Sequence, residues 1–337
     1  MRVTRVINKQ PVINKHISKA RRKRELGKGK PLITKDTLPT YTAEEKRPKI
    51  ALIQTGCWGD NINSTLMFKP ISDHFGDCLI DVYTSTNYGS AFLNNPYINK
   101  LIEYSSGSQH GIDKQAAVHL TLLIPDVIKD FGYDHIFAPH PMYNTGNWNS
   151  SKHPGLGENL IYAWVHALEK ANIECPMPPQ TILKLTEEEV AKVTAFREKI
   201  PEMGSRRTNI MEVHGESGQT FWNDTWTKRV VSHLCSKGEI VFISHRNAHA
   251  QLEAEFRGLC YSVNGLSIRE CAELYNHCDK FFSISSGLSN ACNTDWCRND
   301  VEWIEVINSM VVSSAPIRSK NKTFWHENDL DKFLSTM

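Results

Sequence analysis

The sequence predicts an α/β protein with two parallel, doubly wound domains. Short apolar runs that indicate buried strands alternate with helical patterns along most of the 337 residues, and such alternation is typical of parallel sheets. A chain of this length exceeds one ordinary core. At residues 50–65 and 280–290 a buried strand runs into a small-residue turn and a helix start. Ligands bind at such junctions, so we expect twin nucleotide-binding-type domains facing across a cleft.

Composition and charge divide the chain into four parts. We expect a basic, mobile tail over 1–47, a first domain over 48–178, a second domain over 179–320 and a C-terminal segment over 321–337. The last segment is predicted to form a helix that packs back on the first domain.

The first domain begins with an apolar strand after Pro48, and its first helix places Leu66, Met67 and Ile71 on one side. Its predicted elements are a strand at 49–54, a helix at 63–74, strands at 77–84 and near 101–102, a helix at 114–131, a strand at 133–138, a long loop at 139–157 and a helix at 158–172.

In the second domain, Thr186 followed by three glutamates predicts a capped helix start. The helix over 267–277 has Ile268, Cys271 and Leu274 on one face. The other predicted elements are strands at 209–213, 239–244, 280–285 and 301–306, and helices at 222–236, at 249–257 and from Leu288.

Positive charge is concentrated at the N-terminus. Residues 1–50 hold 15 Lys and Arg against 4 Asp and Glu, a net of +11, and the rest of the chain carries a net of −9. Such a run favours polyanions, either nucleic acid or an anionic membrane surface, and a solvated tail without a partner is the plain alternative. The start has no apolar core of a secretory signal, and no stretch is apolar over the length of a membrane span.

The nine cysteines indicate reduced thiols. Their number is odd, and the gaps between Cys271, Cys278, Cys292 and Cys297 do not match the knuckles of a zinc site. We therefore expect a cytoplasmic protein.

Four stretches give the chain a family resemblance over about residues 48–310. They are Gly56-Cys-Trp-Gly-Asp-Asn-Ile62, Asn95-Pro-Tyr-Ile-Asn99, His214-Gly-Glu-Ser217 with the tryptophans that follow, and 266–290. Together they resemble the GT-B-fold glycosyltransferases, above all the ADP-heptose-type lipopolysaccharide heptosyltransferases. The resemblance implies an acceptor-binding first domain and a second domain that binds a nucleotide-sugar donor.

Asp60 is the candidate catalytic residue. Transfer of a sugar with inversion needs a general base for the acceptor hydroxyl, and in the family the aspartate of the Gly-Asp turn has that role. A carboxylate at a helix N-terminus stays ionised, although a plain capping role fits the position equally well. Gly59, Asn61, His214 and Glu216 are the further candidates for the acceptor side or the cleft.

The donor loop is predicted at the second junction, where amides, a close-approach glycine and serine hydroxyls would cradle a diphosphate. The candidate donor-binding residues are Ser217, Ser244, His245, Arg246, Ser285, Ser286, Gly287, Leu288, Ser289 and Asn290. The chain departs from the family at Ser285 (usually acidic), Asn290 (usually His) and Thr220 (often Lys), and Arg246 is the candidate replacement for the missing phosphate counter-charge.

The patterns of possible metal ligands and of aromatic residues are weak evidence for a functional site. Asp329 and Asp331 lie in a polar segment rather than after a strand, and the spacing of His135, His140 and His153 fits no ligand set. We expect no metal and no cofactor beyond the nucleotide-sugar co-substrate. On the predicted helix 222–236, Trp222 and Trp226 have core spacing.

The leading hypothesis is therefore a metal-independent, inverting glycosyltransferase acting on a glycan or other hydroxyl acceptor. A phage-type enzyme that glycosylates DNA bases and uses the basic tail to find its substrate is one alternative. A nucleotide-binding scaffold without turnover is another, motivated by Thr220 and Ser285. An oxidoreductase is disfavoured because the first turn lacks a G-x-G-x-x-G run.

Overall fold

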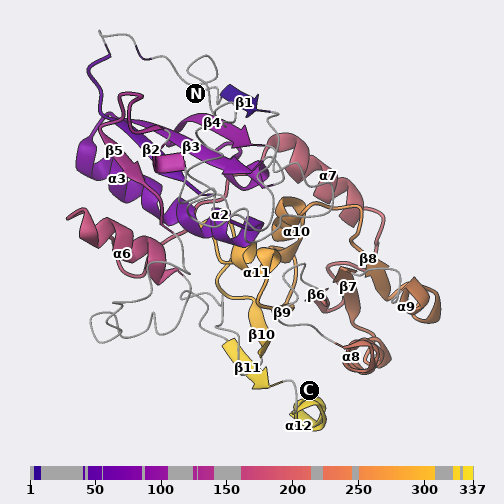
Figure 1. The fold of residues 1–337 in the computed structure, drawn as a ribbon. Coiled ribbons are helices and arrows are strands. Elements are labelled where there is room, and N and C mark those ends of the chain that lie inside the picture. The colour runs from indigo at the N-terminus through magenta and orange to yellow at the C-terminus, as the bar shows by residue number, and fades with distance from the viewer. Residues whose placement is uncertain are drawn as a thin grey trace, which may run out of the picture. The chain divides into compact units, whose positions relative to one another are not determined.

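The computed structural model describes residues 4–8, 41, 45–54, 56–85, 88–104, 124–126, 128–139, 161–213, 223–244, 250–307, 322–326 and 329–336. These residues form two compact units, one from the residues up to 139 together with 161–180, and the other from Thr181 onward. Each unit is built on a parallel sheet (Figure 1), so the predicted α/β class is confirmed.

The first unit contains β1 (Thr4–Asn8), β2 (Lys49–Ile53), α2 (Trp58–Ser64), η2 (Thr65–Met67), α3 (Phe68–Phe75), β3 (Leu79–Ser85), η3 (Gly89–Phe92), β4 (Ile98–Tyr104), β5 (His135–Phe137) and α6 (Tyr162–Lys170). The strand order is β1-β4-β3-β2-β5, and every pair is parallel. The strand β2 therefore lies inside the sheet, next to β3 and β5, and its carboxyl end leads directly into the first predicted junction.

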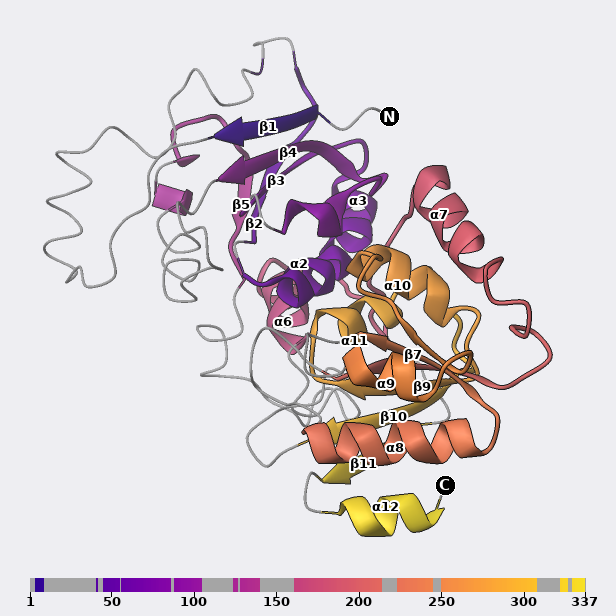
Figure 2. The ribbon, with the colours of Figure 1, turned by 90° about the vertical axis from the view of Figure 1, so that its right-hand side faces the viewer.

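Both faces of this sheet are covered. Ile53, Tyr83 and Ile102 pack on one face against Ile124 and Ile128. The alternate residues of β2 are fully buried on the opposite face, where α2 and α3 lie (Figure 2). A strand buried on both faces must be apolar throughout, which explains the continuous apolar run of β2.

The prediction of a mobile tail over 1–47 is wrong for the parts that the structure describes. Thr4–Asn8 form β1, which pairs in parallel with β4 at the sheet edge. The hydroxyl of Tyr41 donates to the fully buried carboxylate of Asp81, which also accepts hydrogen bonds from Tyr133 at 2.8 Å and Asn99 at 2.9 Å. A buried carboxylate needs such donors, so Tyr41 anchors the end of the basic segment to the first unit.

The second unit contains α7 (Glu187–Arg197), β6 (Thr208–Glu212), α8 (Asp224–Ser236), β7 (Ile240–Ser244), α9 (Ala250–Glu255), β8 (Cys260–Ser262), α10 (Ile268–Tyr275), β9 (Lys280–Ile284), α11 (Gly287–Cys292), β10 (Glu302–Ile307), β11 (Lys322–His326) and α12 (Leu330–Thr336). The strand order is β11-β10-β9-β6-β7-β8, again all parallel. The Thr186 cap is confirmed, because its hydroxyl accepts a hydrogen bond from the Glu189 amide at 3.0 Å.

The C-terminal helix α12 packs on the second unit, not on the first domain as predicted. Phe333 is 2% exposed and belongs to the core cluster under α8. Its ring stacks on Trp226 at 6.2 Å and lies 6.4 Å from Phe282 on the sheet. The sequence interpretation was wrong because β11 places α12 beside α8, on the face opposite α10 and α11 (Figure 2).

All nine cysteines are free thiols, six of them buried, as predicted from their number and spacing. Among the described residues no helix combines the length and the apolar character needed to cross a membrane.

Candidate functional site

The first junction joins β2 to α2 through Gln54, Gly56 and Cys57. Cys57 is the N-cap of α2, and the Asp60 carboxylate accepts a hydrogen bond from the Cys57 amide at 3.0 Å. Asp60 is only partly buried, so a ligand can approach its side chain. The capping interpretation of Asp60 is therefore correct, and it is compatible with a role as general base because a cap leaves the carboxylate charged.

Gly56 allows the polar side chains of this junction to come close together. A Cβ atom on Gly56 would lie 2.5 Å from Asp60 Oδ2 and 2.9 Å from the Nε2 atom of Gln54. Both distances are shorter than real Cβ atoms tolerate. Glycine is needed here for close approach, since any side chain would displace the carboxylate or the carboxamide.

Asn61 has an internal role. The residue is fully buried, and its Nδ2 donates to Thr84 Oγ1 at 2.8 Å and to the Tyr88 carbonyl at 3.3 Å. These bonds hold α2 against the end of β3 and the loop that follows it. Gly59 is buried as well, so the acceptor-side role predicted for both residues remains a prediction.

The second junction joins β9 to α11 through Ser285 and Ser286. Ser286 is the N-cap: its hydroxyl accepts from the Ser289 amide at 3.2 Å, and the Ser289 hydroxyl accepts from the Ser286 amide at 3.0 Å. The Asn290 Nδ2 donates to the Ser286 carbonyl at 2.8 Å. Of the six predicted loop residues, only Ser286 and Gly287 are more than marginally exposed.

Glu212, at the end of β6, is the main feature that the sequence analysis missed at this junction. Its carboxyl group accepts hydrogen bonds from the Ser286 hydroxyl and from the backbone amides of Leu288 and Ser289. These are the donors that the sequence analysis assigned to a phosphate. An anionic ligand at this turn must therefore compete with a carboxyl group that belongs to the chain.

The pKa of Glu212 is raised to about 8. Burial is the main cause, the bonds from Ser286 and the α11 amides oppose it, and the nearby carboxyl group of Glu305 adds to the rise. Ser283 pairs in register with Glu305. The β6–β9 register ends at Met211 and Phe282, and Glu212 and Ser283 are the next residues of these two strands. Glu212, Ser283 and Glu305 thus form a buried polar row across three strands. A proton on Glu212 reduces the cost of burying two carboxyl groups near each other.

Part of the predicted site lies outside the described residues, namely His214, Glu216, Ser217, Thr220, Trp222, His245 and Arg246. Ser244 is described: it ends β7, pairs in register with Glu212 and is partly buried. Trp226 is 6% exposed and packs on Phe333, so its core role is confirmed.

The weak metal patterns find no support in the described residues. Asp331 is exposed and forms an ion pair with Arg229 at 2.7 Å. His135 lies on β5, while His140 and His153 are outside the described residues. No group of three or more His, Cys, Asp or Glu side chains that could hold a metal ion occurs in the described part of the chain.

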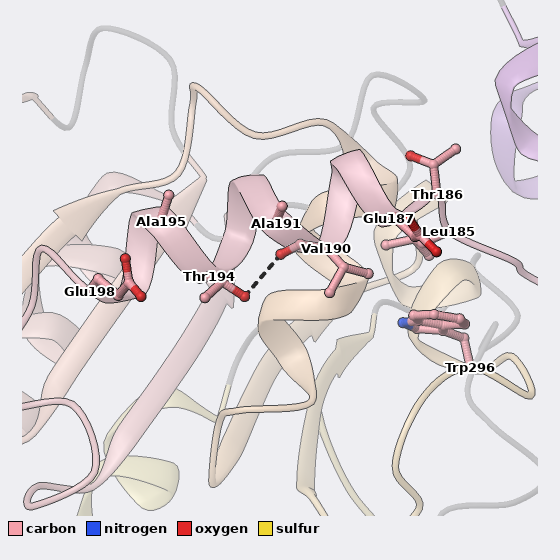
Figure 3. A pocket seen from close by; sticks show the side chains of 9 residues that line it. All are labelled: Leu185, Thr186, Glu187, Val190, Ala191, Thr194, Ala195, Glu198 and Trp296. Carbon is pink, nitrogen blue, oxygen red and sulfur yellow. Dashed lines mark hydrogen bonds between the residues drawn. The ribbon is translucent and has the colours of Figure 1, made fainter.

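A pocket of about 490 Å³ follows one side of α7, with Trp296 at the end where the helix begins (Figure 3). The Trp296 indole donates to Glu273 at 2.7 Å. None of the predicted site residues lines this pocket, so it adds nothing to the two junctions.

Solved structures share this arrangement of strands and helices. The Veillonella parvula glycosyl transferase family 9 protein aligns with 86% of this chain and 89% of its own, at 10% identity and a TM-score of 0.61. The Escherichia coli ADP-heptose lipopolysaccharide heptosyltransferase II aligns with 85% of this chain and 96% of its own, at 14% identity and a TM-score of 0.58. The fold is GT-B. The predicted fold class and the fold-level resemblance to heptosyltransferases are thereby confirmed.

The Escherichia coli heptosyltransferase WaaC with ADP gives the same result, aligning with 86% of this chain and 99% of its own at 9% identity and a TM-score of 0.55. No protein-family model and no curated protein sequence matches the chain. At these identities the likeness establishes the GT-B fold with two Rossmann-like domains, and the chemistry has to be argued from the residues themselves.

Proposed function

We propose that this protein transfers a sugar from a nucleotide-diphosphate donor to a hydroxyl acceptor with inversion at the anomeric carbon. The observation that carries the proposal is Asp60, a partly exposed carboxylate in the first turn of α2, the helix that follows the carboxyl end of β2 in a GT-B fold. Ligands of open α/β sheets bind at this edge.

Asp60 would act as the general base. As the acceptor oxygen attacks the anomeric carbon, its proton moves to the Asp60 carboxylate, and the bond between that carbon and the diphosphate oxygen breaks. The electron pair of the broken bond leaves with the nucleoside diphosphate. A carboxylate suits this role because it remains ionised at the start of α2.

The donor diphosphate is assigned to the β9–α11 junction in this proposal. Ser286 and Gly287 are its partly exposed members, and the amides of α11 point to the same place. Since Glu212 already binds these amides, the diphosphate must share them or displace the carboxyl group. His214, Ser217, His245 and Arg246 belong to the proposal through the sequence alone, because they lie outside the described residues.

The partners and conditions remain part of the proposal. A glycan is the favoured acceptor, and DNA bound through the basic 1–47 segment is the alternative acceptor. Contact of that segment with a membrane surface is a further alternative, and a nucleotide-binding scaffold without turnover is the alternative function. The reaction is proposed to need no metal ion. Nine free thiols fit a cytoplasmic location.

A donor screen tests the function. The protein is incubated with ADP-, UDP-, GDP- and CMP-sugars with and without EDTA, nucleotide release is measured, and thermal stabilisation by each nucleotide is compared with that by NAD. We expect one nucleotide series to stabilise the protein, and its sugar to be turned over in EDTA with inverted product configuration. Stabilisation by NAD alone would contradict a transferase.

A further inference from the structure

Gln54 ends the buried run of β2, and its carboxamide has a fixed orientation. The side chain is fully buried, and its Oε1 accepts a hydrogen bond from the Trp164 indole at 3.1 Å. An indole N–H can only donate, so the carboxamide oxygen must face Trp164. The amino group of Gln54 therefore points the other way, toward the turn.

That amino group is not satisfied. The Nε2 atom of Gln54 is buried without a hydrogen-bond partner among the described residues. Buried donors without a partner are rare because they lose their bonds to water and gain nothing in return. We therefore expect the unpaired amino group of Gln54, at the edge of the sheet where ligands bind, to have a functional role.

The Asp60 carboxylate lies within reach of this amino group. Gln54 Nε2 and Asp60 Oδ2 both pack over the bare Cα of Gly56, at 2.9 Å and 2.5 Å from the position of a Cβ there. Their separation cannot exceed the sum of these two distances. The two atoms are not hydrogen-bonded in this structure, and one bridging oxygen atom or a movement of the Asp60 side chain would join them at ordinary hydrogen-bond lengths of about 2.8–3.0 Å.

We propose that Gln54 is a positioning residue for Asp60: when the acceptor binds, its Nε2 donates to Asp60 Oδ2, and Trp164 holds the carboxamide in the orientation that this requires. The inference rests on the proposed function. It extends that proposal by assigning the residues that orient the carboxylate of Asp60.

The contact assigns different tasks to the two carboxylate oxygens. Oδ2 already accepts from the Cys57 amide at 3.0 Å, and a second donor on the same oxygen fixes the plane of the carboxylate. The acceptor proton is then received at Oδ1. Gln54 takes up no proton and forms no bond to the sugar, so its contribution is orientation.

Three variants test this relay of hydrogen bonds from Trp164 through Gln54 to Asp60. Gln54→Met keeps the length of the side chain and removes both polar atoms. Gln54→Glu keeps an acceptor for Trp164 and replaces the donor with an oxygen that repels Asp60. Trp164→Phe removes the bond that orients the carboxamide.

We expect kcat to fall roughly tenfold or more in Gln54→Met, further in Gln54→Glu and less in Trp164→Phe, with the donor KM within about twofold of wild type. Tyr133→Phe is the matched control. It also removes a side-chain hydrogen bond in the first unit, a partly buried one at 2.8 Å to Asp81, and should leave kcat unchanged.

The outcomes separate this inference from the proposed function. If Asp60→Asn loses turnover while both Gln54 variants retain kcat, the relay is wrong and the base assignment survives. If Asp60→Asn retains turnover, the base assignment fails and the relay fails with it.

A ligand-free readout tests whether the Gln54 amino group lies beside the Asp60 carboxylate, as the contact requires, even if no donor is turned over. In protein labelled with ¹⁵N-glutamine, the side-chain amide resonance of Gln54, assigned from Gln54→Met, should shift in Asp60→Asn and in Trp164→Phe. A resonance unchanged in Asp60→Asn would overturn the proposal.

Discussion

At the residue scale, the carboxyl group of Glu212 couples the second junction to pH. Burial raises its pKa from 4.5 to about 8, so between these values the folded protein keeps a proton that the unfolded chain has released. The free energy of unfolding should therefore fall as pH rises from about 4.5 to about 8, by up to about 1.4 kcal/mol per unit from this group. Glu212→Gln keeps the acceptor oxygen for the α11 amides and removes this dependence.

The measurement is chemical denaturation of wild type and Glu212→Gln between pH 5 and pH 9. The free energy of unfolding of Glu212→Gln minus that of wild type should increase with pH and level off above about pH 8. A constant difference over this range would show that Glu212 is ionised in the folded state throughout.

Gly56 provides a second residue-scale prediction. Because a Cβ at Gly56 would lie 2.5 Å from Asp60 Oδ2, Gly56→Ala must push the carboxylate out of its place at the start of α2. We expect turnover to fall at least tenfold, while nucleotide affinity is unchanged because the donor loop lies in the other unit. Turnover and nucleotide binding are measured on the same preparation, and an active Gly56→Ala protein would show that the position of Asp60 is unimportant.

The sequence pattern identified some of these residues and not others, for a physical reason. Asp60 could be proposed from the sequence because a Gly-Asp turn after an apolar strand has a local signature. Gln54 directly follows one buried strand and Glu212 ends another, and their roles depend on Trp164 and Ser286, which are 110 and 74 residues away. Contacts over such separations leave no periodic trace in a single sequence.

At the element scale, central strands have a local sequence signature, and most edge strands do not. The predicted strands at 49–54, 77–84, 209–213, 239–244 and 280–285 correspond to β2, β3, β6, β7 and β9, all inside their sheets. The strands that were not predicted, β1, β8 and β11, all lie at sheet edges, whereas the remaining edge strand, β5, was predicted at 133–138. A central strand buried on both faces needs a continuous apolar run, whereas an edge strand has one neighbour and tolerates polar residues.

The helix α12 allows a test of element packing. Phe333→Ala removes a 2% exposed ring that contacts Trp226, Trp325 and Phe282, and should lower the free energy of unfolding of the second unit by about 3 kcal/mol. Asp331→Ala on the exposed side of the same helix loses only a solvent-exposed ion pair with Arg229 and should cost less than about 0.5 kcal/mol. Denaturation followed by tryptophan fluorescence measures both, and equal effects would mean that α12 does not pack as described.

At the scale of the whole molecule, the basic N-terminal segment decides between acceptor classes. Because β1 and Tyr41 contact the first unit, deleting 1–47 would remove structural contacts together with charge. Replacing Arg21, Arg22, Lys23 and Arg24 with glutamine tests the charge alone. If the acceptor is DNA, wild type should bind duplex DNA at low salt, and the variant should bind more weakly with a shallower salt dependence. If the wild-type protein does not bind DNA at low salt, the DNA acceptor is excluded and the glycan acceptor is favoured.

The central claim is that Asp60 deprotonates the acceptor in a nucleotide-sugar transfer. The most direct measurement compares wild type and Asp60→Asn for turnover with the donor found in the screen and for affinity toward the matching nucleoside diphosphate. An asparagine keeps an oxygen for the Cys57 amide but cannot serve as the base, so we predict a loss of at least a hundredfold in kcat with affinity unchanged within about twofold. Wild-type turnover in Asp60→Asn would contradict the account.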